Sequence, residues 1–154
     1  MTVAFRRAEV GDVPDIVRLL AEDSLGQSRE QVGDAAAGDY LEAFAEIDAD
    51  PHQELVVAVQ EGRVVGCMQL STIRYLSHRG GTWLQVEGVR VDRELRSRGI
   101  GEAMMRYAVE RARERGCHLV QLTTNAVRTD AHRFYRRLGF EPTHVGFKLH
   151  LPHD

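Results

Sequence analysis

The feature that most constrains this chain is a change of hydrophobic period at residues 92–101. Residues 83–91, which precede it, form a mainly apolar run with the length of a buried β-strand. Beyond it, apolar side chains recur at helical spacing until Gly116: Ile100, Met104, Ala108 and Ala112. A further strand-like run at 119–124 follows. Strand, helix and strand in this order predict a crossover, so part of the sheet is expected to be parallel.

The chain before residue 83 predicts antiparallel strands. Residues 54–60 and 64–71 are β-rich runs joined by a short turn that contains Gly62, which is a hairpin signal. A short strand is expected at 3–7. A helix is expected to follow it, with Asp12 as its N-cap and Pro14 near its first position.

The remaining regions complete the predicted fold. Residues 26–37 are polar and rich in glycine and alanine, so we expect a mobile loop there. A second amphipathic helix follows, with these apolar residues: Tyr40, Leu41, Phe44 and Ile47. A helix is predicted at 130–138, and short strands around Phe140 and at 144–151. Together these elements describe an α+β fold with a mixed sheet and about four helices, and the length of 154 residues favours a single domain, 1–154.

Composition argues against several classes of protein. With 43% hydrophobic and 28% charged residues, the chain can bury a core and keep a solvated surface. No apolar run approaches the roughly 20 residues that cross a bilayer, and residues 1–7 lack the apolar stretch of a signal peptide. A formal net charge of -3 argues against a general nucleic-acid binder. We therefore expect a cytoplasmic protein that binds neither nucleic acid nor membrane.

Cysteine and histidine spacing predicts no metal centre and no disulfide framework. Cys67 and Cys117 stand far apart, each in an apolar segment, and are interpreted as small core residues. The 7 histidines are dispersed and match no zinc-ligand spacing.

Charge is distributed unevenly along the chain. Acidic residues dominate 22–50, and arginines dominate 90–115. This asymmetry suits a cationic acceptor on one side and a phosphorylated cofactor on the other. The simpler interpretation of any single charge is a solvated helix face.

Residues 96–101, at the change of period, have the properties of an anion-binding turn. Gly99 and Gly101 allow the backbone to approach a ligand, and the start of a helix presents unpaired N–H groups. The guanidinium groups of Arg96 and Arg98 add charged donors. A tightly packed turn without a ligand is the alternative interpretation. The segment is neither a P-loop nor a G-x-G-x-x-G fingerprint, which disfavours ATP and NAD.

Two motifs resemble those of a known family. The R-x-x-G-x-G pattern at 96–101 resembles the acyl-CoA-binding motif of the GNAT superfamily of N-acetyltransferases. The A-x-x-F-Y-x-x-x-G-F pattern at 131–140, preceded by Asn125, resembles its second motif. Within the superfamily, Glu87 and the residues at 124–135 look most like those of the aminoalkylphosphonate N-acetyltransferases.

The resemblance implies a GNAT-like, mostly antiparallel sheet whose central strands splay apart, and acetyl-CoA as the cosubstrate. By similarity, Val89 and Val91 offer backbone groups to the pantetheine arm, and Asn125 bonds the pantetheine or pyrophosphate arm. Backbone amides from Arg96 through Glu102 would hold the pyrophosphate: Arg96, Arg98, Gly99, Gly101 and Glu102. For Asn125 the alternative is a role in a turn.

Two residues are candidates for acid–base chemistry. Glu87 interrupts an apolar strand, where its carboxylate can take the amine proton directly or through water, and Gly88 beside it would permit a bulge. The alternative for Glu87 is a solvent-facing or ion-paired residue. Tyr135 matches the family position whose phenol protonates the departing thiolate, whereas Phe134 is expected to pack into the core.

These features predict an enzyme that acetylates a primary amine. Candidate acceptors are an aminoalkylphosphonate, a polyamine, an amino sugar or a protein amino group. The acidic region favours a cationic amine, whereas an aminophosphonate needs bases such as Arg74, Arg79 or Arg90 near the pocket. The alternative is a non-catalytic acyl-CoA sensor or regulatory module. The resemblance also suggests a homodimer.

Overall fold

The computed structural model describes residues 2–22, 24–33 and 37–152. The chain divides into two compact units, Met1–Leu122 and Thr123–Asp154.

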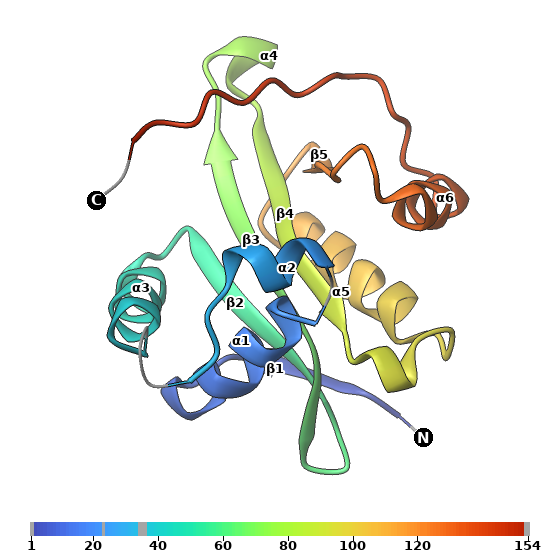
Figure 1. Ribbon diagram of the computed structural model, residues 1–154. Coiled ribbons are helices and arrows are strands. Elements are labelled where there is room, and N and C mark those ends of the chain that lie inside the picture. The colour runs from blue at the N-terminus through green and yellow to red at the C-terminus, as the bar shows by residue number, and fades with distance from the viewer. Residues whose placement is uncertain (1, 23, 34–36, 153–154) are drawn as a thin grey trace. The chain divides into compact units, whose positions relative to one another are not determined.

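The first unit is built on a five-stranded sheet in the order β1-β2-β3-β4-β5 (Figure 1). The strands have these bounds: β1 Ala4–Arg7, β2 Gln53–Gln60, β3 Arg63–Arg74, β4 Thr82–Val91 and β5 Leu119–Leu122. Strands β1 to β4 pair antiparallel, and β5 pairs parallel to β4. The predicted mixed, mostly antiparallel sheet is therefore confirmed.

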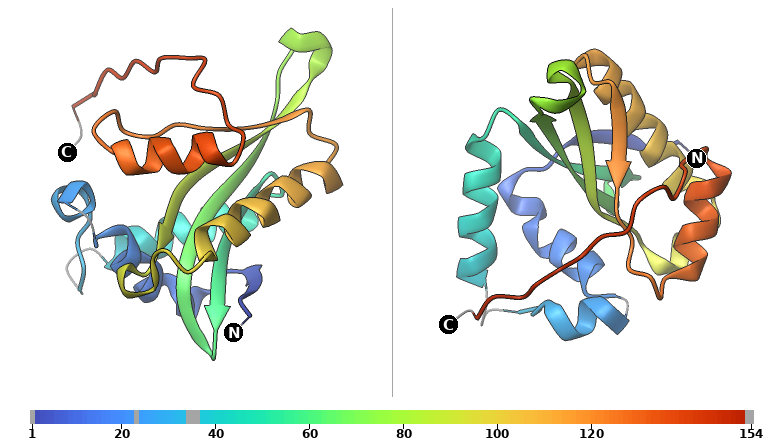
Figure 2. Two further views of the ribbon diagram at one scale, coloured as in Figure 1. Left: turned by 90° about the vertical axis from the view of Figure 1, so that its right-hand side faces the viewer. Right: turned by 90° about the horizontal axis from the view of Figure 1, so that it is seen from above.

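Helices cover both faces of this sheet. On one side lie α1 Val13–Leu20, α2 Ser24–Arg29 and α3 Ala37–Ala49, and on the other lies α5 Ile100–Glu114 (Figure 2). Short turns are the 3-10 helices η1 Val10–Asp12 and η3 Arg93–Leu95, and the single turn α4 Ser77–Gly80. No helix among the described residues is long and apolar enough to cross a membrane.

Each face of the sheet has its own apolar core. The α1 and α3 side buries a cluster that includes Leu19, Val57 and Cys67. On the α5 side, Met104 and Ala108 are almost completely buried, as are the sheet residues Met68 and Leu84. Cys67 is thus a core residue, as predicted, whereas Cys117 is only half-buried, and both are free thiols.

Strand β4 continues beyond its last pair with β5. The β4–β5 register ends at Val86 and Leu122, whereas β4 runs on to Val91. Against β3, Glu87 pairs with Gln69 and Arg90 with Cys67, so β4 uses one more residue than β3 over this interval. Gly88 has a φ of 62°, which other residues rarely adopt. The predicted bulge is present, and the backbone of 87–91 carries no strand on its β5 side within Met1–Leu122.

One expectation for the first unit is wrong in part. Residues 26–37 were expected to form a loop, but α2 begins at Ser24 and continues through Gly26 to Arg29, and α3 begins at Ala37. Residues 30–33 have no regular secondary structure, as expected, and 34–36 lie outside the described residues. One glycine inside a helix costs only about 1 kcal/mol, so the glycine and alanine content of the segment did not exclude a helix there.

The expected start of α1 is confirmed, with Asp12 at the N-cap position and Pro14 among the first helical residues. The Asp12 side chain makes no capping hydrogen bond, because its carboxylate accepts from Arg6 at 2.6 Å and from the Glu9 N–H at 2.8 Å.

The second unit contains the helix α6, Thr129–Arg137. The strands expected around Phe140 and at 144–151 are absent from the described residues, which have no regular structure from 140 to 152. Alternate apolar side chains in this segment are exposed: Val145, Phe147, Leu149 and Leu151. The alternation is strand-like, but a strand also requires a partner edge, which a sequence pattern does not contain.

Candidate active site

The turn between β4 and α5 has the backbone geometry of an anion-binding site. Ser97 has a φ of 65°, and Gly99, the N-cap of α5, has a φ of 82°. No side chain caps this helix start. Since the first N–H groups of a helix have no partner inside it, those of Ile100, Gly101 and Glu102 are available to an anion.

The two arginines of this turn are available to a ligand. Arg96 and Arg98 are exposed, and neither has an ion pair or hydrogen bond within the part of the chain that the structure describes. Arg98, Gly99 and Ile100 also line a pocket of about 330 Å³. Two exposed guanidinium groups without ion-pair partners, beside the start of a helix, are suited to bind the oxygens of a pyrophosphate.

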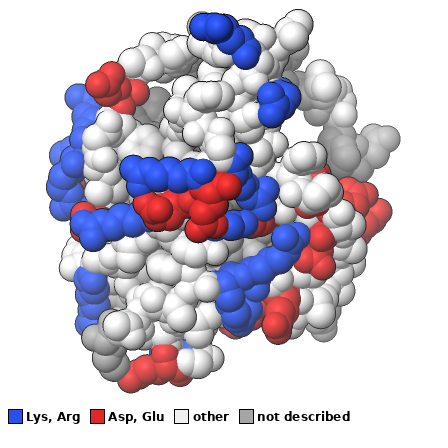
Figure 3. Space-filling model, turned by 180° about the vertical axis from the view of Figure 1, so that it is seen from behind, with Lys and Arg blue, Asp and Glu red and all other residues white. Residues whose placement is uncertain are grey.

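Most arginines that follow the turn are engaged by acids. In α5, Arg106 pairs with Glu102 at 3.1 Å, and Arg113 pairs with Glu110. Arg111 and Arg115 both bind Glu54 of β2. Acidic and basic side chains accordingly lie interspersed on the face shown in Figure 3. Among the described residues, these four arginines are therefore paired with acids, whereas Arg96 and Arg98 of the turn are not.

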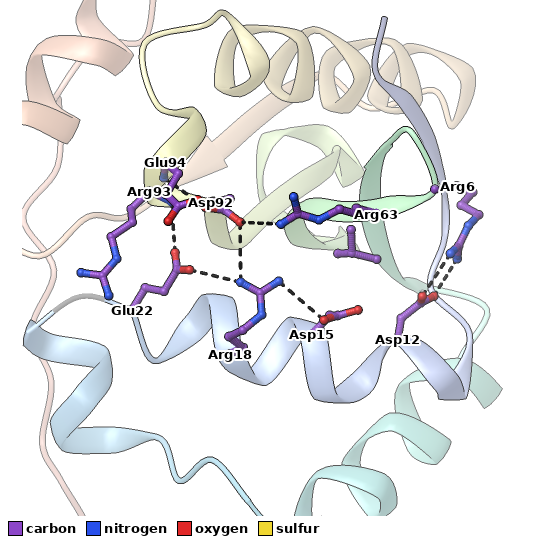
Figure 4. A pocket seen from close by; sticks show the side chains of 11 residues that line it. Arg6, Asp12, Asp15, Arg18, Glu22, Arg63, Asp92, Arg93 and Glu94 are labelled. Carbon is purple, nitrogen blue, oxygen red and sulfur yellow. Dashed lines mark hydrogen bonds and ion pairs between the residues drawn. The ribbon is translucent and has the colours of Figure 1, made fainter. Parts of the chain in front are cut away.

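Asp92, the residue that opens the turn, lies beside a charged pocket of about 570 Å³ (Figure 4). Asp92 as a whole is only 5% exposed, and its carboxylate accepts a hydrogen bond from the Glu94 N–H at 3.0 Å. Arg18 of α1 and Arg63 of β3 approach it at 3.6 and 3.8 Å. The sequence predictions did not include Asp92, although an Asp directly before a helical turn is a common N-cap.

Glu87 lies on the α1 side of the sheet with an exposed side chain. Gln69 is its neighbour on β3, and Gln85 precedes it on the same face of β4, where it accepts a hydrogen bond from Gln121 at 2.9 Å. The Glu87 carboxylate itself has no hydrogen bond or ion pair among the described residues of Met1–Leu122. A carboxylate in this state can accept a proton.

Three of the predicted site residues thus lie on β4, the strand that leads directly into the turn. Glu87 comes first, Val89 and Val91 follow in the part of β4 that extends past β5, and the turn begins at Asp92. Val89 and Val91 are half-buried. The backbone edge that they belong to is the one expected to meet the pantetheine arm.

Asn125 belongs to the second unit, where it organises the turn before α6. Its side-chain oxygen accepts from the Val127 N–H at 3.1 Å, and its carbonyl accepts from the Arg128 N–H at 3.0 Å. The His132 ring lies 3.1 Å from the same carbonyl. The role in a turn that the sequence allowed is therefore present, and it uses the amide oxygen but not the amide nitrogen.

Tyr135 lies near the end of α6 among aromatic rings. It makes edge contacts with Phe134 and Phe140, at centroid distances of 5.1 and 5.8 Å. Phe134 is half-buried rather than in a core, with the Arg137 guanidinium 5.7 Å above its ring. None of the α6 side chains is fully buried, so the expectation that Phe134 packs into the core is wrong.

Neither cysteine has the environment of a nucleophile. Burial raises the pKa of Cys67 to about 12, which keeps the thiol protonated. Burial also raises the pKa of Cys117. Within the described ranges, no group of three or more His, Cys, Asp or Glu residues could hold a metal ion.

Comparison with known proteins identifies the class of this fold and site. Residues 15–140 match the acetyltransferase (GNAT) family. The aminoalkylphosphonate N-acetyltransferase of Salmonella typhimurium is 34% identical over 109 residues, which cover 70% of each chain. A probable glucosamine 6-phosphate N-acetyltransferase of Oryza sativa is 32% identical over 144 residues, covering 86% of this chain and 85% of that protein.

A solved structure is similar over almost the full length. It is described as a transcriptional regulator from Bacillus halodurans, with 43% sequence identity and a TM-score of 0.94. The match covers 97% of this chain and 100% of that chain. The chain thus belongs to the GNAT family and is an acyl-CoA-dependent N-acetyltransferase.

Proposed function

We propose that the protein transfers the acetyl group of acetyl-CoA to the primary amine of a small molecule. The observation that carries this proposal is the continuous segment from Glu87 to the start of α5. It joins a free carboxylate, an open strand edge and an uncapped helix start flanked by two unpaired arginines. A base, an arm-binding edge and a pyrophosphate site are what transfer from a CoA thioester requires.

In this proposal the donor lies along that segment. Backbone groups of Val89 and Val91 bind the pantetheine arm. The N–H groups of Gly101 and Glu102, with the Arg96 and Arg98 side chains, bind the pyrophosphate, and Gly99 allows the turn. Asn125 contributes its amide N–H groups to the pantetheine or pyrophosphate arm. The same residues bind CoA after the transfer.

Two residues move protons. Glu87 accepts a proton from the ammonium group of the acceptor, directly or through water, and the free amine attacks the thioester carbonyl. The carbon–sulfur bond then breaks, and the Tyr135 phenol donates a proton to the departing thiolate. The second proton that the nitrogen loses as the amide forms passes to the Tyr135 phenolate and restores the phenol. The products are an amide and CoA with a free thiol.

The acceptor class is supported by the relatives. The names of two of them specify an aminoalkylphosphonate and glucosamine 6-phosphate, both small primary amines with an anionic group. Of the arginines considered for such an anion, Arg74 donates to the Gly80 carbonyl at 2.8 Å and Arg90 to the Val89 carbonyl at 2.9 Å. A polyamine or an amino sugar is kept as an alternative acceptor, because the Glu87 carboxylate is exposed on this face of β4 and can attract a cationic amine.

A thiol-release assay tests this function. The protein is incubated with acetyl-CoA and, separately, 2-aminoethylphosphonate, glucosamine 6-phosphate, spermidine and a peptide with a free amino terminus. We expect release of CoA thiol with at least one of the three small amines, and an acetylated product by mass spectrometry. Turnover with the peptide alone would contradict the small-molecule assignment.

A second candidate is a regulatory protein that binds acyl-CoA without turnover. The 43% identity to a structure described as a transcriptional regulator favours it. The free Glu87 carboxylate favours the enzyme, because binding alone requires no base. Micromolar binding of acetyl-CoA by calorimetry, with no thiol release from any amine, would support the regulator.

The proposal also covers the location, domain organisation and oligomeric state of the protein. We place it in the cytoplasm as one functional domain over 1–154 that forms a homodimer and binds neither nucleic acid nor membrane. Two free cysteines fit a reducing compartment. Light scattering of the purified protein measures the dimer directly, and a monomer at micromolar concentration would contradict it.

A further inference from the structure

Two acidic residues hold the start of the turn that precedes α5. Within the described residues, the hydrogen bonds of 93–98 run from Glu94 and Leu95 to Asp92, and from the Arg93 N–H to the Glu22 carboxylate at 3.3 Å. Arg96, Ser97 and Arg98 make none. The start of the turn is therefore held through Glu22 and through Asp92, whose own N–H also donates to the Val65 carbonyl at 2.8 Å.

Arg18 binds both of these anchors. Its Nη1 lies 3.2 Å from the Glu22 carboxylate and 3.6 Å from that of Asp92, and its Nη2 lies 3.5 Å from Asp15 (Figure 4). One side chain of α1 thus holds two acids, one of which accepts the first N–H of the turn. The other opens the turn and is almost buried.

The other cation at Asp92 is a weaker partner. Arg63 lies 3.8 Å from Asp92 and its side chain is 69% exposed, compared with 39% for Arg18. An exposed ion pair at that distance contributes little. Without Arg18, a buried carboxylate would keep this distant partner and the Glu94 N–H, and Glu22 would lose the cation that fixes its direction.

We propose that Arg18 is a positioning residue for acetyl-CoA: through Asp92 and Glu22 it holds the turn that binds the pyrophosphate. This inference rests on the donor site of the proposed function. A turn that is already fixed before the ligand binds loses less conformational entropy on binding. Arg18 therefore raises the affinity for the ligand without contacting it. Because the thioester lies elsewhere on the donor, the chemical step does not depend on Arg18.

The test compares two acetyl donors. S-acetylpantetheine carries the same thioester as acetyl-CoA but has no pyrophosphate. In Arg18→Ala, we expect the KM for acetyl-CoA to rise about tenfold, with kcat changed by less than about twofold. The KM for S-acetylpantetheine should stay at its wild-type value. Arg18→Lys, which keeps the charge but not the fork of donors, should recover part of the affinity.

Arg7→Ala is the matched control. Arg7 of β1 is 44% exposed and lies 3.2 Å from Asp48. The substitution therefore removes an ion pair of similar exposure that does not involve the turn. It should leave both KM values unchanged. An unchanged KM for acetyl-CoA in Arg18→Ala, or an equal rise for both donors, would overturn the proposal. If Arg18→Ala does not fold, Glu22→Ala must show the same donor selectivity.

Binding measurements separate this inference from the proposed function. If the wild-type protein binds CoA but acetylates no amine, calorimetry with CoA and pantetheine replaces the two KM values, and the same selectivity is required of Arg18→Ala. If the wild-type protein does not bind CoA, the proposed function fails and the inference fails with it.

Discussion

Glu54 and Glu87 lie two strands apart in one sheet and have opposite surroundings. Glu54, on the α5 side, is 7% exposed and binds Arg115 at 2.5 Å and Arg111 through two hydrogen bonds. Glu87, on the α1 side, is exposed and has no partner in Met1–Leu122. The first carboxylate holds β2 to the end of α5, whereas the second is free to take a proton.

The same contrast separates the two ends of α5. At its end, Arg111 and Arg115 are held by Glu54, and Glu114 also binds Arg111 at 2.5 Å. Before its start, Arg96 and Arg98 are unpaired. Paired charges stabilise the fold, and unpaired charges of the same kind are available for ligands. The predictions below test this division.

The largest effect is expected from Glu87→Gln. Loss of the proton acceptor should lower kcat/KM about 100-fold at pH 7 in the thiol-release assay. The deficit should shrink near pH 10, because a larger fraction of a primary amine is then deprotonated in solution. Glu61→Gln, in the exposed β2–β3 turn, should be unaffected. Full activity of Glu87→Gln at every pH would remove Glu87 as the base.

Glu54→Gln should affect stability instead of activity. Burial alone would raise the pKa of Glu54, but hydrogen bonds from Arg111 and Arg115 outweigh it and hold the pKa below its usual value. We expect the variant to lose about 2 kcal/mol of unfolding free energy in urea at pH 7, with kcat/KM unchanged.

The pH dependence of that loss has a defined sign. Since the Glu54 pKa is lowered in the folded state, its stabilisation is complete above the unfolded value of 4.5. It disappears as the pH falls below 4.5 through the lower folded value. The difference between wild type and Glu54→Gln should therefore vanish in acid, and a constant difference down to that range would contradict the ion-pair explanation.

Tyr135→Phe is expected to lower kcat about tenfold, with the KM for acetyl-CoA unchanged, as a thiolate is a moderately good leaving group that needs limited protonation. Tyr107→Phe is the control, because Tyr107 stacks on Phe5 at 4.9 Å and burial raises its pKa. Equal turnover of Tyr135→Phe and wild type at saturating substrates would exclude the acid role.

The smallest effect is expected when Arg96 and Arg98 are both replaced by alanine. The KM for acetyl-CoA should rise about fivefold, since the backbone N–H groups of the helix start remain and exposed charges are screened. The increase should be smaller in 0.5 M salt. Arg113→Ala, which breaks only a surface pair with Glu110, should change nothing. An increase of equal size in Arg113→Ala would mean that general positive charge, rather than the turn, attracts the donor.

Much of this organisation was predictable because it is local. The hairpin of β2 and β3, the bulge at Gly88 and the uncapped start of α5 each follow from residues adjacent in the chain. The strand expected at 144–151 is wrong because a strand depends on a partner that lies elsewhere in the chain. These residues alternate like a strand but have no regular structure, and among the described residues no strand pairs with them.

The sequence by itself determined the family, the donor class and the position of the turn. The R-x-x-G-x-G motif and the change of hydrophobic period beside it are both formed by residues that are adjacent in the chain, so no tertiary information is needed to recognise them. Only the tertiary structure decided which charges are free. Along the chain, Glu54 and Glu87 look alike, as do Arg18 and Arg7. Folding brings Arg111 and Arg115 to Glu54 and Arg18 to Asp92, and a charge is neutralised by its neighbours in space, whatever their distance in sequence.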